Sequence, residues 1–144
     1  MGCSEVASPP AGVVLPADYD VIGRIENFGS NPETFDATAD VYDTTDGAWT
    51  QIFTATVTLT DFPVGGDSLV DFGTVTFAAD KYFYTEIYTE LAGDADPSND
   101  TSSVFSRTAV ALGDVVYELD IQGAAGGDAY LVGCEFDGSY FYIT

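Results

Sequence analysis

Residues 82–91 alternate strictly between two kinds of side chain, and this alternation constrains the fold more than any other feature of the chain. One set is apolar or Thr and the other is Tyr or Glu: Phe83, Thr85, Ile87, Thr89 and Leu91 against Tyr82, Tyr84, Glu86, Tyr88 and Glu90. A period of two residues places successive side chains on opposite faces of a β-strand. Such a strand needs neighbours beside it and a second layer to cover its apolar face.

Six further segments have the same period or are rich in β-branched and aromatic residues, and turn sequences separate them. They are residues 12–15, 19–27, 35–42, 49–60, 69–77 and 102–111. In the fifth, the alternation slips around Gly73, which predicts a β-bulge. No amphipathic helix is recognisable. The spacing predicts an all-β protein, a seven-strand antiparallel β-sandwich.

The chain divides into three predicted parts. Residues 1–12 form a flexible lead-in, residues 13–111 the sandwich, and residues 112–144 a C-terminal extension. The extension contains a strand-like run at 114–121 and a hairpin around Asp137 and Gly138. The two cysteines, Cys3 and Cys134, lie near opposite ends of the chain. Two readings stay open: a disulfide that closes a long loop, or two free thiols.

The charge of the chain excludes several classes of partner. Its 24 acidic residues face only Arg24, Lys81 and Arg107, which gives a net charge of -21. Nucleic acid and anionic membranes are excluded because both require clustered basic side chains. No apolar stretch is long enough to span a membrane. An acidic surface of this kind favours cations and basic proteins. The partners that we expect overall are other protein chains or copies of this chain.

Catalysis is not expected. The chain has no His, so it lacks the imidazole base of common nucleophilic triads. The glycines of residues 123–127 have no following Lys or nucleotide fingerprint. With so many carboxylates, pairs arise by chance and none is informative. We therefore predict no catalytic residues.

The acidic loop that follows the Tyr-rich strand is the main candidate metal site, and a second cluster, Asp40, Asp43 and Asp46, is a weaker one. Asp94, Asp96, Ser98 and Asp100 present oxygen atoms at alternate positions, as calcium loops do. However, Pro97 interrupts the pattern, and the Gly and terminal Glu of an EF-hand are missing. The alternative, which we favour, is an acidic turn whose side chains accept local backbone hydrogen bonds. Ca²⁺ is therefore the only cofactor considered.

Aromatic side chains on the polar face of strand 82–91 form a candidate interface. Tyrosine is enriched in protein interfaces and in sugar-binding platforms because it offers flat area and a hydroxyl. Ordinary cross-strand pairing is the simpler explanation. A third reading has the aromatic C-terminal strand covering this face. The interface candidates are Tyr82, Tyr84, Tyr88, Tyr140, Phe141 and Tyr142.

Three short motifs in a fixed order resemble a known family. They are Asn27-Phe-Gly29, Phe62-Pro-Val-Gly-Gly66, and the segment from Gly93 to Thr101. This order, over about residues 13–108, resembles the CARDB-type domains, which are immunoglobulin-like seven-strand sandwiches of bacterial and archaeal secreted and cell-surface proteins. The acidic loop is longer than usual in that family, and the C-terminal extension is an addition.

The resemblance implies a non-catalytic structural or adhesive module in an extracellular or cell-surface protein. Such a module could self-associate through its edge strands or through the aromatic C-terminal strand. The alternative is a calcium- or carbohydrate-binding accessory module of a larger secreted protein.

Overall fold

The structure is a computed structural model that describes residues 1–94, 96–109, 134–136 and 141–143. The chain forms two compact units, residues 1–112 and 113–144. For residues 134–136 and 141–143 only the backbone is described. No helix in the described part of the chain is long and apolar enough to cross a membrane.

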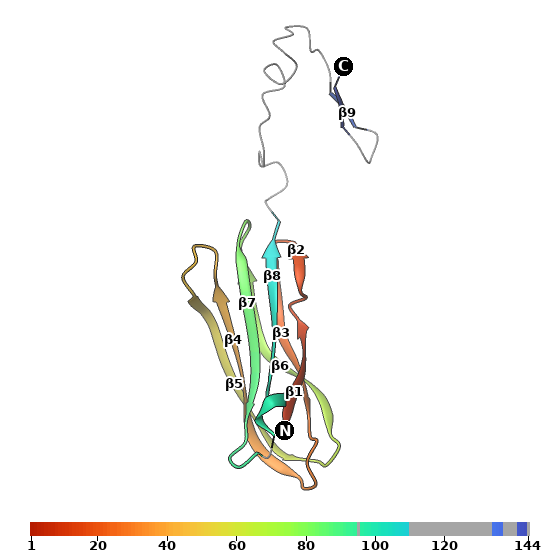
Figure 1. The fold of residues 1–144 in the computed structure, drawn as a ribbon, viewed down its shortest axis with the longest axis vertical. Helices are drawn as coiled ribbons and strands as arrows, with labels where there is room; N and C mark the ends of the chain where they lie inside the picture. The colour runs from red at the N-terminus through yellow and green to blue at the C-terminus, as the bar shows by residue number, and fades with distance from the viewer. Residues whose placement is uncertain (95, 110–133, 137–140, 144) are drawn as a thin grey trace. The chain divides into compact units, whose positions relative to one another are not determined.

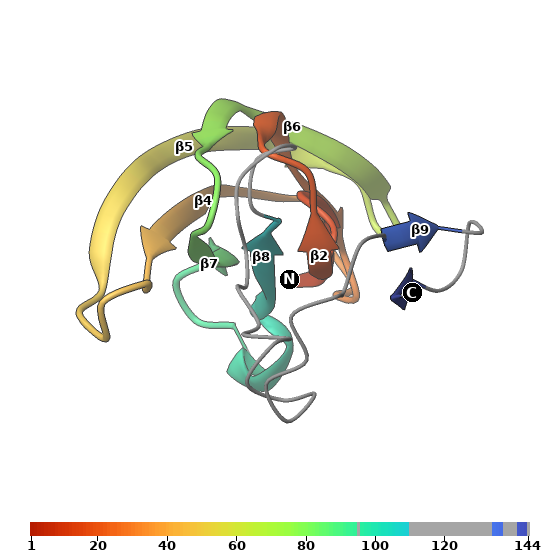
Figure 2. The same cartoon turned by 90° about the horizontal axis from the view of Figure 1, so that it is seen from above.

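The first unit is a sandwich of two β-sheets (Figures 1 and 2). One sheet has three strands in the order β1-β3-β6, and the other has five in the order β2-β8-β7-β4-β5. A single turn of 3-10 helix, η1, lies between β7 and β8. The elements are β1 Gly2–Ser8, β2 Gly12–Val14, β3 Ala17–Glu26, β4 Glu33–Asp43, β5 Thr50–Phe62, β6 Asp67–Phe77, β7 Tyr82–Glu90, η1 Pro97–Asn99 and β8 Thr101–Thr108.

The alternating residues fill the space between the two sheets, as the sequence predicts. Small and branched side chains of β4 share one hydrophobic core with aromatic and branched ones from β7, in the same sheet, and from β3 and β6, in the opposite sheet. The rings of Phe77 in β6 and Phe83 in β7 stack with centroids 3.8 Å apart and an interplanar angle of 8°. The least exposed core side chains include Val21, Ile25, Ala37, Ala39, Val41 and Ile87, each at 0%.

The β-bulge predicted around Gly73 is confirmed. The register of β3 and β6 shifts between Asp20 and Ile22, which pair with Thr74 and Asp71. Gly73 has φ +116°, a backbone conformation that side chains with a Cβ rarely adopt. The shift lets both ends of β6 keep their apolar face toward the core.

The predicted flexible lead-in over residues 1–12 is wrong. Residues 2–8 form β1, which pairs antiparallel with β3, and Met1, Cys3 and Val6 are buried in the core. Two register shifts, between Cys3 and Glu5 and between Val6 and Ser8, break the period of two. The sandwich therefore starts at the first residues of the chain and not at Val13.

All seven predicted strands are present, and β1 is an eighth. One pairing departs from the antiparallel prediction, because β2 runs parallel to β8 at the edge of the five-stranded sheet. The predicted hairpin in the second unit is confirmed at the backbone: β9 (Cys134–Phe136) pairs antiparallel with β10 (Phe141–Ile143). The predicted strand at 114–121 lies outside the described residues.

Candidate interaction surface

Four aromatic side chains meet on the outer face of the five-stranded sheet. Phe105, Tyr84 and Tyr42 lie directly opposite one another on β8, β7 and β4. Trp49, from the segment between β4 and β5, lies beside them. Ring centroids are 4.8 Å apart for Trp49 and Tyr84, 4.8 Å for Tyr84 and Phe105, and 5.8 Å for Tyr42 and Trp49. We call these four residues the aromatic cluster.

The turn between β4 and β5 carries Trp49 back over the sheet. The carboxylate of Asp43 accepts hydrogen bonds from the backbone N–H of Thr45 (2.9 Å) and from its hydroxyl (2.5 Å). Gly47 donates its N–H to the carbonyl of Thr44 at 3.2 Å and has φ +76°. This Asx-type turn fixes the chain reversal that precedes Trp49.

The aromatic cluster is open to solvent. Phe105 is 60% exposed and Trp49 is 57% exposed, while Tyr42 and Tyr84 are half-buried beneath them. The interplanar angle is 52° for Trp49 and Tyr84 and 50° for Tyr84 and Phe105. The rings therefore form an uneven surface and not a flat platform.

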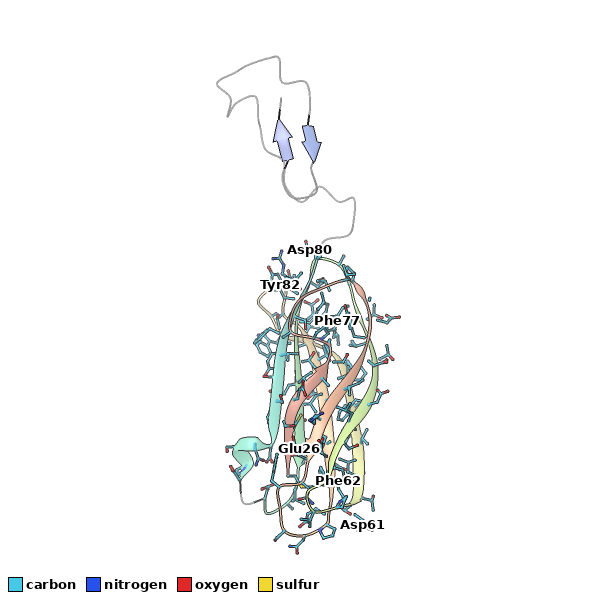
Figure 3. The ribbon with its side chains drawn as sticks, turned by 90° about the vertical axis from the view of Figure 1, so that its right-hand side faces the viewer. Glu26, Asp61, Phe62, Phe77, Asp80 and Tyr82 are labelled. Atoms are coloured by element: carbon cyan, nitrogen blue, oxygen red, sulfur yellow. The ribbon has the colours of Figure 1, made fainter. Side chains whose placement is uncertain are left out.

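Two of the three basic side chains lie at the same end of the sandwich. The guanidinium carbon of Arg107 is 5.2 Å from the centroid of the Tyr82 ring, and these residues pair across β8 and β7 one row beyond Phe105. The Lys81 ammonium contacts the Asp43 carboxylate at 3.1 Å. In a chain of net charge -21, this end carries most of the positive charge. Figure 3 shows Tyr82, Asp80 and Phe77 together at this end.

Carboxylates lie in the next row of the same face. Glu86 and Asp40 are directly opposite each other on β7 and β4. The Tyr84 hydroxyl donates to Glu86 at 2.8 Å, and Gln51 donates to Asp40 at 2.8 Å. Burial raises the pKa of Tyr84, and the hydrogen bond to Glu86 and its charge add to the rise. The Tyr84 hydroxyl thus remains a protonated donor at neutral pH.

Sequence reasoning found part of this surface. Tyr84 belongs to the aromatic cluster, Tyr82 is 44% exposed beside it, and Tyr88 lies two rows from Tyr84, near Asp40. Tyr42, Trp49 and Phe105 were missed. Phe105 could have been found, because it alternates with the inward residues of β8. The side chains of Tyr140, Phe141 and Tyr142 lie outside the described residues.

The acidic loop forms a network of local hydrogen bonds. The backbone N–H of Asp96 donates to the Asp94 carboxylate at 2.9 Å, and the Ser98 hydroxyl donates to that of Asp96 at 2.5 Å. The Met1 ammonium forms an ion pair with Asp94. Burial raises the pKa of Asp100, and the nearby Asp94 charge adds to the rise. Among the described residues, no group of three or more Cys, Asp or Glu side chains is arranged to hold a metal ion.

Cys3 lies in the core of the sandwich, 3% exposed, and no disulfide joins it to another residue whose side chain is described. Burial raises its pKa to about 11, against the opposing effect of backbone hydrogen bonds at Glu5 and Ser102. The side chain of Cys134 lies outside the described residues, so both readings, a disulfide between the two cysteines or two free thiols, stay open.

The fold has a relative among solved structures. No family model matches the chain, and no curated protein matches it. The chain is similar to the CARDB domain of a Pyrococcus furiosus protein, solved in complex with di-metal ions. The two are 12% identical with a TM-score of 0.51, over 71% of this chain and 87% of that one. The likeness confirms the predicted fold, a CARDB-type immunoglobulin-like sandwich.

Proposed function

We propose that this chain is a non-catalytic interaction module of an extracellular or cell-surface protein, and that its aromatic cluster binds another protein chain. The observation that supports this most is the exposure of Trp49 and Phe105 above half-buried tyrosines. Soluble monomers rarely leave several large aromatic side chains together in solvent unless they contact a partner. The extracellular setting rests on the CARDB-type fold and on the acidic composition.

The composition of the surface favours a protein partner. Trp, Tyr and Arg are the residues most enriched in the energetic centres of protein interfaces. Here Trp49, Tyr84 and Arg107 lie within one end of one sheet face. The rings are tilted by about 50° to one another. An uneven surface of this kind fits protruding side chains better than the flat face of a sugar ring.

The charge distribution points to the same end. Over most of this protein a second acidic molecule would be repelled, since the net charge is -21. Arg107 reduces the repulsion beside the aromatic cluster, whereas the charge of Lys81 is balanced by Asp43. An acidic or neutral protein can therefore approach here most easily, and Arg107 is available for a carboxylate on that partner.

Photo-crosslinking from the cluster tests the proposal. Phe105 is replaced by a benzophenone-bearing phenylalanine in the full chain, which is then irradiated with surface-protein extract of the source cells. We expect a discrete protein adduct that unlabelled chain competes away and that Trp49→Ala weakens by about thirtyfold or more, as for an interface hot spot. The matched control places the same group at Leu69, which is 58% exposed on the other sheet.

Equal labelling from positions 105 and 69 would contradict the proposal.

Trp49 is the only tryptophan of the chain, so its fluorescence reports ligands at the cluster. A saturable change with soluble polysaccharides and no protein adduct would replace this proposal with the carbohydrate-binding alternative. The calcium alternative stays a prediction, and a rise in melting temperature with millimolar Ca²⁺ would support it.

A further inference from the structure

One edge of the five-stranded sheet is long and has an uncharged central stretch. β5 is the last strand of that sheet, and within the described residues no strand pairs with its far side (Figure 1). It has 13 residues, more than any other described strand. From Thr50 to Thr60 it contains no charged residue, Pro or Gly. Its register with β4 is unbroken from Phe53 to Leu59.

The other edges carry features that prevent strand addition. Natural edge strands are usually short, charged, interrupted by Pro or bulged, because a bare edge recruits further strands. β2 has three residues and is soon followed by Pro16. β6 carries Asp67 and Asp71 and is bulged at Gly73. The register of β1 shifts twice. β5 also has two register shifts with β4, but both lie outside Phe53–Leu59, and this stretch carries no charge, Pro, Gly or bulge.

The inner face of β5 is incompletely buried. On β4, which has a strand on each side, the inward residues Phe35 to Val41 are 0–4% exposed. The equivalent side chains of β5 are only partly buried against the same core: Phe53, Ala55, Val57 and Leu59. A further strand beside β5 would complete their burial in the way that β5 completes that of β4.

The charge of the molecule limits where two copies of the chain can meet. Two copies of a protein of net charge -21 repel over most of their surfaces. The segment Thr50–Thr60 brings no charge to an edge contact. The nearest carboxylates on β4 already accept hydrogen bonds from β5, Asp36 from the Thr58 hydroxyl at 2.6 Å and Asp40 from Gln51 at 2.8 Å.

We propose that β5 pairs antiparallel with β5 of a second copy of this chain, about a two-fold axis at Thr56, and so joins the two five-stranded sheets. An antiparallel strand of this sequence is complementary to itself. Large side chains then oppose large ones, small oppose small, and no two charges are opposed. The opposed pairs are Phe53 with Leu59, Ala55 with Val57, Thr54 with Thr58, and Thr56 with its own copy. This pairing goes beyond the proposed function, since it uses no residue of the aromatic cluster.

Sedimentation of the full chain tests the pairing. We expect a monomer–dimer equilibrium that tightens by about tenfold or more between low and high salt, because screening weakens the repulsion of the two copies. Val57→Lys places a charge on the inner face of the edge and should weaken the dimer by about tenfold or more. The control Leu69→Lys makes the same charge change on β6 and should leave the dimer as it is.

Disulfide trapping locates the axis and does not depend on the lysine variant folding. In a Cys134→Ser background, Thr56→Cys should form a covalent dimer under mild oxidation, because the two copies of residue 56 are directly opposed. Thr60→Cys, which would face Ile52 of the other copy, should cross-link far more slowly. The buried Cys3 is common to both variants.

Four results would overturn the pairing. One is a protein that stays monomeric up to about millimolar concentration at high salt, where association should be favoured. Another is a dimer that responds equally to Val57→Lys and Leu69→Lys. The third is equal cross-linking at positions 56 and 60. A dimer lost in Phe141→Lys and retained in Val57→Lys would assign association to the C-terminal strand instead. Trp49→Ala should leave the dimer intact, which separates this proposal from the proposed function.

Discussion

The side-chain amide of Asn27 donates a hydrogen bond of 3.0 Å to the main-chain carbonyl of Phe62, 35 residues away. The same amide donates to the carbonyl of Asn31 at 2.9 Å, and its oxygen accepts from the N–H of Gly29 at 2.8 Å. Asn27 is 2% exposed. One side chain therefore joins two of the three family-like motifs, at the end of the sandwich where Figure 3 labels Glu26, Asp61 and Phe62.

The glycines of the second motif, Gly65 and Gly66, form main-chain hydrogen bonds in the same junction, where the loop at Asn27 contacts the loop at residues 62–66. The N–H of Gly65 donates to the carbonyl of Asn27 at 3.1 Å, and the N–H of Asn27 donates to the carbonyl of Gly66 at 2.9 Å. Gly65 has φ +67°, and a Cβ on Gly66 would lie 2.8 Å from the carbonyl oxygen of Pro63. The order of motifs noticed in the sequence thus has a physical cause, the closure of this end of the sandwich.

Asn27→Ala should destabilise the fold by about 3 kcal/mol, since three partly buried side-chain hydrogen bonds of about 1 kcal/mol each are lost. Urea unfolding measures the loss. The control is Asn31→Ala, because only the main-chain carbonyl of Asn31 takes part in this junction. An Asn27→Ala cost no larger than that of Asn31→Ala would show that the loops hold together without the amide.

The sequence alone predicted the strands whose side chains follow a period of two. It did not predict the strand in which that period breaks. One buried face imposes alternation on β4 and β7, so their inward residues were identified correctly. In β1 the buried Cys3 and Val6 are three positions apart, because bulges absorb the extra residues. No period-based reasoning detects such a strand.

The aromatic cluster depends on register and could not be derived from local pattern. Tyr42, Tyr84 and Phe105 are adjacent only because β4, β7 and β8 are neighbours in one particular alignment. That order is a property of the whole sandwich. The acidic loop, in contrast, could be predicted from local sequence. Its hydrogen bonds join residues two positions apart and do not depend on strand register.

Gly23→Ala should destabilise the fold by about 1–3 kcal/mol through overpacking. An added Cβ would lie 3.0 Å from both Cδ1 and Cγ2 of Ile87, which extends from the opposite sheet. Ile87→Val removes the Cδ1 methyl and should therefore recover part of the loss in the double variant. Additive costs, measured by a double-mutant cycle in urea, would show that the two residues do not compete for space.

The Cys3 thiol should be inert in the folded protein. With a pKa of about 11, only about one thiol in a thousand is ionised at pH 8, and the thiolate is the reactive species. In a Cys134→Ser variant, we expect Ellman's reagent to react slowly under native conditions and rapidly with one thiol in denaturant. In the unsubstituted chain, two thiols in denaturant would exclude a disulfide, whereas none would establish the predicted bond to Cys134.

Asp43→Asn and Asp100→Asn should change the free energy of unfolding at neutral pH in opposite directions. Burial alone would raise the pKa of Asp43, but hydrogen bonds from Thr45 and the Lys81 ammonium hold it below the usual range. Its ionised form is favoured in the folded state, so its contribution is present above the unfolded pKa and is lost as the pH falls through the folded pKa. Asp43→Asn should thus destabilise the protein at neutral pH by about 1 kcal/mol, the net scale of a typical protein hydrogen bond.

Asp100→Asn should instead stabilise the protein at neutral pH. Burial, reinforced by Asp94, raises the pKa of Asp100, so folding favours its protonated form. The stability that this group contributes is present below the unfolded pKa near 4 and is lost as the pH rises through the folded pKa. The uncharged amide keeps an oxygen that can accept from the Thr89 hydroxyl, 3.3 Å away in the parent. Thermal melts from pH 3 to pH 7 should show the gain growing with pH. A gain independent of pH would mean that the charge of Asp100 is not the cause.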